Sequence, residues 1–221
     1  MTNSIFLKSI LNSRDDIWRL GDETPKNLEI YKSGLKELDT FLPNGGWPQI
    51  GLIEVIVERY GLGELQLLMP LMRNLTNQDK ILLWICPPYK ICTSALLNAG
   101  IDIEKLLIIR SEVKKKDALW AAEQALQTQE FGIVLLWQNH LKRNALHRLL
   151  LATKNNKTLG VLFKKEKTEN SQSSMILKLE ASSRKGLNTR TKTRKMKLQI
   201  LKINGSLKPK RKKTITEIII N

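Results

Sequence analysis

Residues 51–75, GLIEVIVERYGLGELQLLMPLMRNL, decide the fold of this chain. The β-branched run at residues 52–57 predicts a buried strand. A glycine-containing turn follows at residues 59–63, and the apolar segment at residues 65–75 predicts a helix. A strand, a tight glycine turn and a helix in this order are the layout of a phosphate-binding loop, whose backbone N–H groups hold the anion. The sequence therefore predicts an α/β fold with such a turn at the end of one strand.

This turn lacks the side chains that such loops use on phosphate. In the pattern G-x-x-x-x-G-K-[ST], Lys contacts the outer phosphates and the hydroxyl binds Mg²⁺. Here Glu58 replaces the first Gly, Glu64 replaces the Lys and Leu65 replaces the Ser or Thr, while Gly61 and Gly63 keep the turn. A carboxylate near phosphates costs roughly a few kcal/mol at the effective dielectric of a protein surface. We therefore expect a degenerate phosphate loop without a cofactor, in which Glu64 instead caps the following helix.

The sequence also lacks the carboxylate that binds Mg²⁺ in such a nucleotide site. The strand at residues 131–137 runs directly into Gln138 and Asn139, without the carboxylate that would hold Mg²⁺. His140 and His147 have no Cys or carboxylate partners at ligand spacing, so we expect no metal site. Glu54 and Glu64 flank the turn, but no arrangement of a nucleophile and a base is legible beside them. The sequence predicts a protein that is not an enzyme and has no catalytic residue.

Apolar strands and helices alternate after the turn, which predicts a mostly parallel sheet with helices on both faces. The expected strands are residues 81–86, 106–109, 131–137 and 159–163, and the expected helices are residues 93–99, 117–127 and 144–154. Ahead of the turn, Ser33 is expected to cap a helix at residues 35–42. Apolar and polar residues alternate at residues 175–179, 197–203 and 215–220, which predicts C-terminal antiparallel strands.

The positive charge is concentrated at the C-terminal end. The 221 residues carry a net charge of +16, and residues 164–221 hold 17 Lys and Arg against 4 Asp and Glu. We therefore expect three parts: an N-terminal segment and linker (1–30), an α/β core (31–163) and a basic extension (164–221). A polyanion such as DNA is one expected partner of the extension, and a merely solvated extension is the alternative. The nucleic-acid candidates are Arg190, Lys192, Arg194, Lys195, Lys208, Lys210, Arg211, Lys212 and Lys213.

The aromatic and sulfur-containing residues indicate packing. No aromatic residue is interleaved with the basic clusters, so we expect phosphate contacts without sequence-specific readout. Trp47, Trp84, Trp120 and Trp137 are expected to pack in or around the core. The two cysteines form no disulfide framework, and Cys86 is expected in the core of a soluble, cytoplasmic protein without a membrane span.

The N-terminal Ile5, Phe6 and Leu7 form a short apolar group that is a candidate for docking onto another protein. The alternative is a helix that packs on its own domain.

Several motifs, in order, resemble one family. Residues 33–42 with the following Gly-Gly pair resemble the start of the RecA-like fold. More narrowly, residues 42–48 (LPNGGWP), 61–65 (GLGEL), 84–88 (WICPP) and 117–126 (DALWAAEQAL) resemble ImuA, the bacterial translesion-synthesis accessory family. The resemblance covers residues 18–163 and continues weakly through the terminal strands. It implies a RecA-like sheet, induction in the SOS response, and ImuB, an error-prone DNA polymerase and RecA as partners.

A related family gives a second hypothesis. SulA, the SOS cell-division inhibitor that blocks FtsZ assembly, shares the sheet but not the helix and Gly-Gly-Trp-Pro segment at residues 35–48. Our first hypothesis is a non-catalytic adaptor in error-prone translesion DNA synthesis, and the alternative is a SulA-type inhibitor. An atypical RecA-like ATPase is the third, and Glu64 and Leu65 argue against it.

Overall fold

The computed structural model describes residues 29–61, 63–154, 156–165, 175–182, 194–203 and 214–220. The side chains of residues 175–182, 194–197, 202–203 and 214–220 are not described. Several candidate residues lie outside the described part: Ile5, Phe6, Leu7, Arg190, Lys192, Lys208, Lys210, Arg211, Lys212 and Lys213. The expected docking group and most of the expected nucleic-acid contacts therefore stay predictions.

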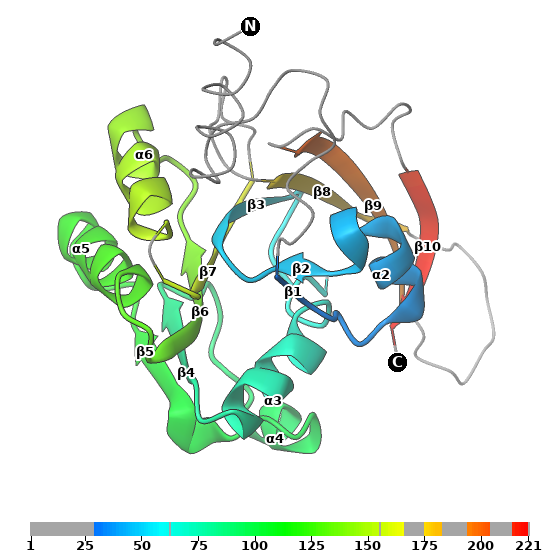
Figure 1. Ribbon diagram of the computed structural model, residues 1–221, viewed down its shortest axis with the longest axis horizontal. Helices are drawn as coiled ribbons and strands as arrows, with labels where there is room; N and C mark the ends of the chain where they lie inside the picture. Colours follow the sequence, from blue (N-terminus) through cyan, green and yellow to red (C-terminus); the bar gives the residue numbers. More distant parts are fainter. Residues whose placement is uncertain are drawn as a thin grey trace, which may run out of the picture.

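One eight-stranded sheet organises the described chain, in the order β10-β9-β8-β3-β7-β6-β4-β5 (Figure 1). Its strands are β3 (Gly51–Val57), β4 (Ile81–Ile85), β5 (Leu106–Ile109), β6 (Phe131–Trp137), β7 (Leu159–Lys164), β8 (Met175–Ser182), β9 (Arg194–Ile203) and β10 (Thr214–Ile220). The helices are α2 (Lys36–Phe41), α3 (Met69–Asn77), α4 (Thr93–Asn98), α5 (Lys115–Leu126) and α6 (Arg143–Ala152), with 3₁₀ turns at Pro43–Gly45 and Ile103–Lys105. The predicted α/β class is confirmed.

The C-terminal strands continue this sheet. β9 pairs antiparallel with β8 and with β10, as the sequence predicts. β8, however, runs parallel to β3, with Ile53 opposite Met175. The parallel part of the sheet thus includes β8, because an alternating pattern reports the exposure of one face and not the direction of a strand. The boundary proposed at residue 163 falls inside β7 and stays a prediction.

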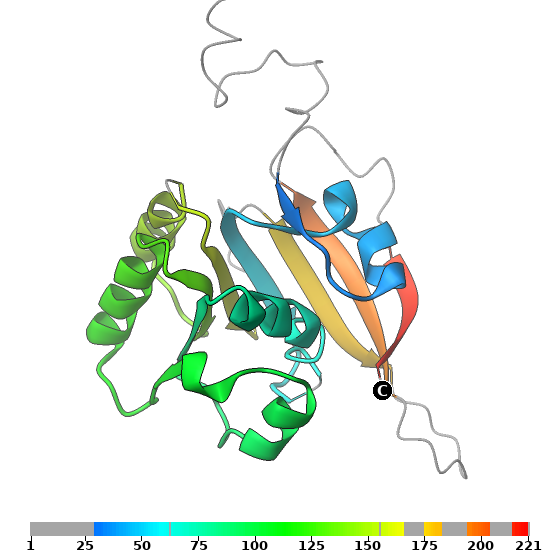
Figure 2. The same cartoon turned by 60° about the horizontal axis from the view of Figure 1, so that its bottom comes forward.

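Helices cover both faces of the sheet, as Figures 1 and 2 show. α5 and α6 lie on one face, where Ala122 and Leu149 pack against Leu136 and Leu162. α2, α3 and α4 lie on the other face, around residues such as Leu71. The central strands β3, β4, β6 and β7 are buried along almost their whole length, so burial on two faces explains their nearly continuous apolar runs.

The segment ahead of β3 belongs to this core. β1 (Ile30–Tyr31) and β2 (Trp47–Pro48) form a small antiparallel sheet in which Tyr31 lies opposite Trp47. Gly46 passes so close to this pair that an added Cβ would lie 2.4 Å from the carbonyl oxygen of Tyr31. The Gly-Gly-Trp-Pro motif therefore has a packing reason, since any side chain at position 46 would force the two strands apart.

Three local expectations need correction. The Ser33 hydroxyl bonds the backbone N–H and C=O of Leu35 and does not cap α2, whose first turn begins at Lys36. α3 begins at Met69 and not near residue 65, because Pro70 fits only the first turn of a helix. Trp47, Trp84 and Trp137 are buried as expected, but Trp120 on α5 is 61% exposed. In the described ranges, no helix is long and apolar enough to cross a membrane.

Candidate phosphate-loop site

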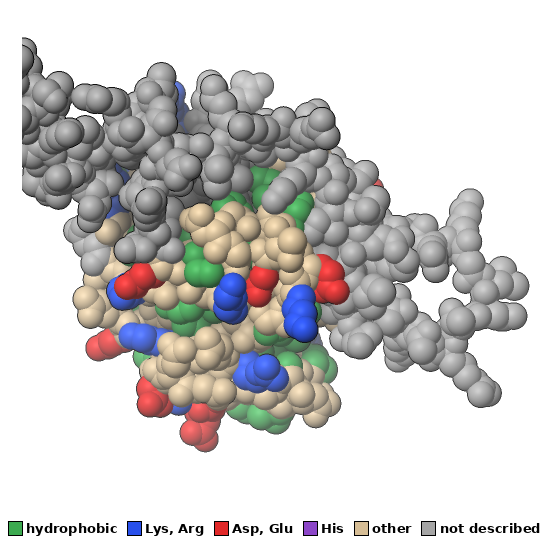
Figure 3. Space-filling model, turned by 45° about the vertical axis from the view of Figure 1, so that its right-hand side comes forward, with side chains coloured by type: hydrophobic (Ala, Val, Ile, Leu, Met, Phe, Trp, Pro, Cys, Tyr) green, Lys and Arg blue, Asp and Glu red, His purple; other side chains and the backbone are tan. Residues whose placement is uncertain are grey.

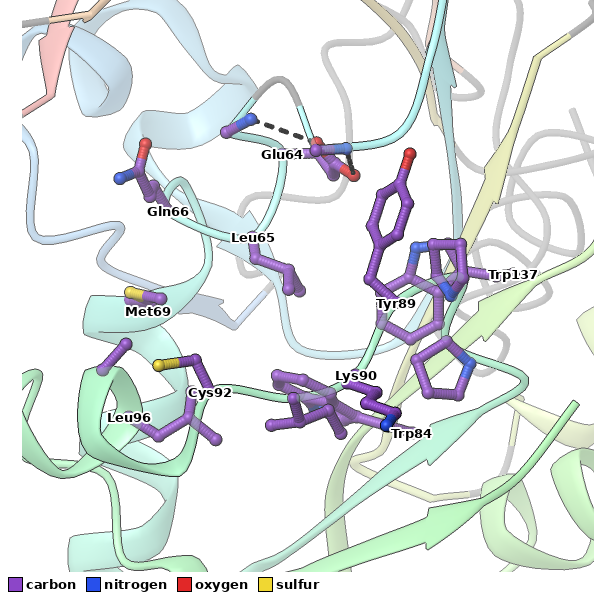
Figure 4. A pocket seen from close by; sticks show the side chains of 16 residues that line it. Glu64, Leu65, Gln66, Met69, Trp84, Tyr89, Lys90, Cys92, Leu96 and Trp137 are labelled. Carbon is purple, nitrogen blue, oxygen red and sulfur yellow. Dashed lines mark hydrogen bonds between the residues drawn. The ribbon is translucent and has the colours of Figure 1, made fainter.

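The glycine turn between β3 and α3 holds a carboxylate of its own chain. Gly61 and Gly63 both have positive φ, 83° and 110°, which turns their N–H groups toward one point. The Glu64 carboxylate occupies that point: Gly61 N–H donates to Oε1 at 2.8 Å and Gly63 N–H donates to Oε2 at 3.1 Å (Figure 4). Glu64 is 4% exposed. An internal anion therefore uses N–H donors that such a turn would otherwise offer to phosphate.

Glu64 does not cap the helix that follows it. Residues 64–68 form turns. Leu68 is the N-cap residue of α3, and no side chain makes a capping hydrogen bond there. The carboxylate thus stabilises the glycine turn, and the helix-capping expectation is wrong. The reason is Pro70, which fits only the first turn of a helix and so places the start of α3 at Met69, beyond the glycine turn.

The other turn residues do not fit a nucleotide and its Mg²⁺. Leu65 packs against the apolar core, where a metal-binding hydroxyl would be required. Glu58 at the end of β3 is exposed, so it does not share the position of Glu64. The structure brings Gly61, Gly63, Glu64 and Leu65 together around one cavity and leaves Glu58 outside it.

The end of β6 carries an amide where a metal carboxylate would be needed. The Tyr60 hydroxyl donates to Asn139 Oδ1 at 2.5 Å, and the Lys165 N–H donates to the same oxygen at 3.1 Å. The Lys165 ammonium lies 5.4 Å from the centre of the Tyr60 ring. Burial, and then the charge of Glu64, raise the pKa of Tyr60 to about 12, so the phenol stays a hydrogen-bond donor at neutral pH. Asn139 therefore fastens the turn to β6 and β7.

A buried ion pair crosses two central strands. The Lys164 ammonium on β7 bonds Glu54 on β3, and the two residues are 1% and 0% exposed. Burial lowers the pKa of Lys164 to about 8. The sequence did contain a signal for this pair, since Glu54 is the only charged residue in β3. The sequence does not identify the partner of Glu54, because the pairing of β3 with β7 brings together residues that are 110 positions apart.

A cavity of about 240 Å³ opens beside the turn (Figure 4). Leu65 and Met69 line it next to α3, and Trp84, Tyr89 and Trp137 line it where β4 and β6 end. Crevices at this end of the strands are the usual ligand position in α/β folds. The cavity walls are aromatic and aliphatic, so they suit an apolar or planar group and not a polyphosphate.

The remaining candidate residues do not form a site in the described chain. Cys86, beyond the end of β4, is half-buried with φ of 56°, and burial raises the pKa of its thiol. The described ranges contain no group of three or more His, Cys, Asp or Glu placed to hold a metal ion. Arg194 and Lys195 open β9 opposite Ile220 and Ile219 of β10. On the face in Figure 3, Lys or Arg and Asp or Glu side chains are interspersed over the described part.

Comparison with known proteins finds a family model that is similar to the core of the sheet. Residues 51–160 match the family model described as "Cell division inhibitor SulA". Proteins named "Cell division inhibitor SulA" from Yersinia pestis (strain Pestoides F) and Yersinia pseudotuberculosis serotype O:1b (strain IP 31758) are 33% identical over 99 residues. The alignment covers 45% of this chain and 58% of each relative, so the chain spans little more than half of their length.

The match runs from the first residue of β3 to the second residue of β7 and includes the glycine turn and Glu64. The SulA relationship implied by the sequence is thus supported, while the narrower ImuA assignment stays a prediction. Residues 51–160 of this chain are thus similar to the SulA family.

Proposed function

We propose that this protein is a non-catalytic inhibitor of cell division in the SOS response, which binds FtsZ and blocks its assembly. The observation that carries the proposal is the SulA match over residues 51–160. The geometry of the turn supports the non-catalytic part, because Glu64 takes two N–H donors that phosphate would need. A non-catalytic inhibitor acts by binding its target through a surface.

The free edge at β5 supports a protein partner. β5 ends the sheet in the described chain, so one side of its backbone is unpaired. Leu107 and Ile108 are 48% and 43% exposed on its two faces. Exposed apolar edge strands are pairing sites unless a protein protects them. We propose that FtsZ contacts this edge.

An FtsZ sedimentation assay tests the proposal. Equimolar wild-type protein is expected to reduce the amount of polymerised FtsZ that sediments with GTP. Leu107→Asp is expected to weaken this inhibition by about tenfold or more, as for an interface anchor. Leu151→Asp is the matched control, since Leu151 is similarly exposed on α6. Unchanged FtsZ sedimentation with the wild-type protein would contradict the proposed function. Equal inhibition by Leu107→Asp and Leu151→Asp would contradict the proposed contact of FtsZ with the β5 edge.

The segment before β3 favours a second candidate, an ImuA-type adaptor in translesion synthesis. Residues 30–48 lie outside the SulA match, yet Leu38 and Trp47 of this segment are fully buried in the core. Recovery of ImuB, an error-prone polymerase or RecA with the tagged protein from DNA-damaged cells supports the adaptor. Recovery of FtsZ without them supports the inhibitor.

Weak DNA binding by the basic extension is a separate proposal that follows from its charge. Truncation at residue 163 is unsuitable as a test, because it removes three strands of the sheet. Replacing Lys208, Lys210, Arg211, Lys212 and Lys213 by Gln leaves the strands in place. We expect single-stranded DNA affinity to fall about tenfold or more at low salt, with a shallower salt dependence. Equal affinity and equal salt dependence would contradict direct binding through these residues.

A further inference from the structure

The loops after β5 and β6 carry a concentration of positive charge. Both strands belong to the parallel part of the sheet, so both loops leave its carboxyl edge, and α5 and α6, which begin there, lie side by side (Figures 1 and 2). Residues 110–116 and 140–143 contain six Lys or Arg and one acidic residue, Glu112. We call the six exposed cations the basic rim: Arg110, Lys114, Lys115, Lys116, Lys142 and Arg143. Within the described ranges, none of them forms an ion pair.

The basic rim places positive charge where the helices disfavour it. Lys115 and Lys116 lie in the first turn of α5, and Arg143 is the first residue of α6. The N-terminal end of a helix has a partial positive charge, which favours acidic and not basic side chains there. Asp117 supplies one carboxylate in the first turn of α5, whereas the first turn of α6 has none. The mutual repulsion of these charges would be relieved by a bound anion.

A hollow of about 270 Å³ lies between the two loops. Ser111 and Lys115 line it from the loop after β5, and Gln138 and His140 line it from the loop after β6. Hydroxyl, ammonium, amide and imidazole groups are those that proteins use on phosphate, sugar and base edges of nucleic acids. The volume is slightly below the usual range for small-molecule sites. Because most of the basic rim lies outside this hollow, an extended anion would contact more of the charge than a small one.

The composition of the two loops favours a nucleic acid over an acidic protein. Val113, 38% exposed, is the one large exposed apolar side chain that the described chain has in these loops. Protein–protein interfaces have an apolar and aromatic core from which charges are depleted. Interfaces with nucleic acid are polar and strongly positive. A single strand fits better than a duplex, because turning one nucleotide into a hollow costs least where the base is not paired.

We propose that the basic rim binds single-stranded nucleic acid, with its Lys and Arg side chains on successive phosphates and one nucleotide in the hollow beside His140. Binding is independent of sequence, since phosphate contacts carry no sequence information. The site belongs to the folded core and is distinct from the basic extension. It also goes beyond the proposed function, because inhibition of FtsZ through β5 does not require it.

Two charge-matched variants of the full-length protein test the proposal. One replaces Lys114, Lys115 and Arg143 by Gln. The other replaces three exposed cations away from these loops by Gln: Lys36, Arg73 and Lys154. Fluorescence anisotropy follows the binding of a labelled oligothymidine over a range of salt concentrations. The rim variant is expected to lose about tenfold or more in affinity at low salt and to show a salt slope that is shallower by about 2, because each phosphate contact to a single strand contributes about 0.7.

The control variant is expected to keep the salt slope of the wild-type protein. Both variants retain the basic extension, so its contribution is the same in each. Equal affinity and equal slope in the two variants would overturn the proposal. Polyglutamate that displaces the oligothymidine at a lower charge concentration than unlabelled oligothymidine would assign the rim to an acidic protein and also overturn it. Tighter binding of a duplex of the same length would contradict the preference for a single strand.

Photo-crosslinking locates the contact without any substitution. The wild-type protein is irradiated with an oligonucleotide that contains 5-bromodeoxyuridine, and mass spectrometry identifies the crosslinked peptides. Crosslinks are expected within residues 110–116 or 138–143. Crosslinks confined to the basic extension at residues 164–221 would overturn the proposal, and they would leave the FtsZ proposal untouched.

Discussion

Lys164→Met is expected to lower the free energy of unfolding by about 3–5 kcal/mol, because it leaves the Glu54 carboxyl buried without its ammonium partner. Both side chains lie in the middle of the sheet, on neighbouring strands β3 and β7. Urea unfolding monitored by circular dichroism measures the loss. Lys157→Met is the control, since the Lys157–Glu29 pair is 61% and 55% exposed and should contribute less than about 1 kcal/mol.

The double replacement Glu54→Leu with Lys164→Met should restore most of the stability that the single change removes. Two buried charges are often replaced by apolar residues at little cost, because the desolvation of both charges disappears with them. A double variant as unstable as Lys164→Met alone would show that the loss arises from misfit of the new side chain and not from the unpaired carboxyl.

The pH dependence gives a second readout of the same pair. The pKa of Lys164 is lowered to about 8 by burial, below its ordinary value of 10.5. Between these two values the unfolded chain binds more protons at this position than the folded chain, so stability rises with pH in this window. The rise attributable to Lys164 is about 3 kcal/mol over the whole window. It should be absent in Lys164→Met, and an equal pH slope in that variant would contradict the assignment.

Glu64→Ala has the second largest expected effect, and it changes both stability and binding. The Gly61 and Gly63 N–H groups lose a charged acceptor, which should lower the free energy of unfolding by about 2 kcal/mol. The same change frees these donors and removes a negative charge, so the affinity for inorganic phosphate or ATP should increase about tenfold or more. Titration calorimetry measures the affinity, and denaturation measures the stability.

Two companion variants separate charge from shape at the turn. Glu64→Gln keeps the size and one acceptor oxygen while removing the charge, so its phosphate affinity should lie between those of the wild-type protein and Glu64→Ala. Glu58→Ala removes an exposed carboxylate from the same turn and should change neither property. An unchanged phosphate affinity in Glu64→Ala would show that the carboxylate is not what keeps anions out.

The central strands of the sheet could be predicted from the sequence because they are buried on both faces. The continuous apolar run of residues 131–137 becomes the buried strand β6 with the same bounds, whereas the run of residues 106–109 becomes the edge strand β5, whose two middle residues are exposed. Burial between two layers of helices leaves a local signal in each strand. The direction of a strand leaves no local signal in the sequence, so the parallel pairing of β8 with β3 could not be predicted.

The site was harder to predict because its contacts depend on backbone geometry and on distant partners. The glycines and Glu64 are adjacent in sequence, so an internal anion could be inferred from the motif alone. The N–H groups that the Glu64 carboxylate accepts from could not be inferred. The position of Pro70 in α3 decides that the carboxylate bonds the turn and not the helix. The Glu54–Lys164 pair and the aromatic cavity join β3, β4, β6 and β7, and only the fold brings these segments together.

Titration of the wild-type protein with ATP and Mg²⁺ tests whether the Glu64 carboxylate occupies the place that phosphates would take in the glycine turn. We expect no binding heat up to about 1 mM ATP and no hydrolysis above the rate of free ATP. Micromolar affinity, with magnesium-dependent hydrolysis that disappears when Gly63 is changed to Val, would contradict this expectation.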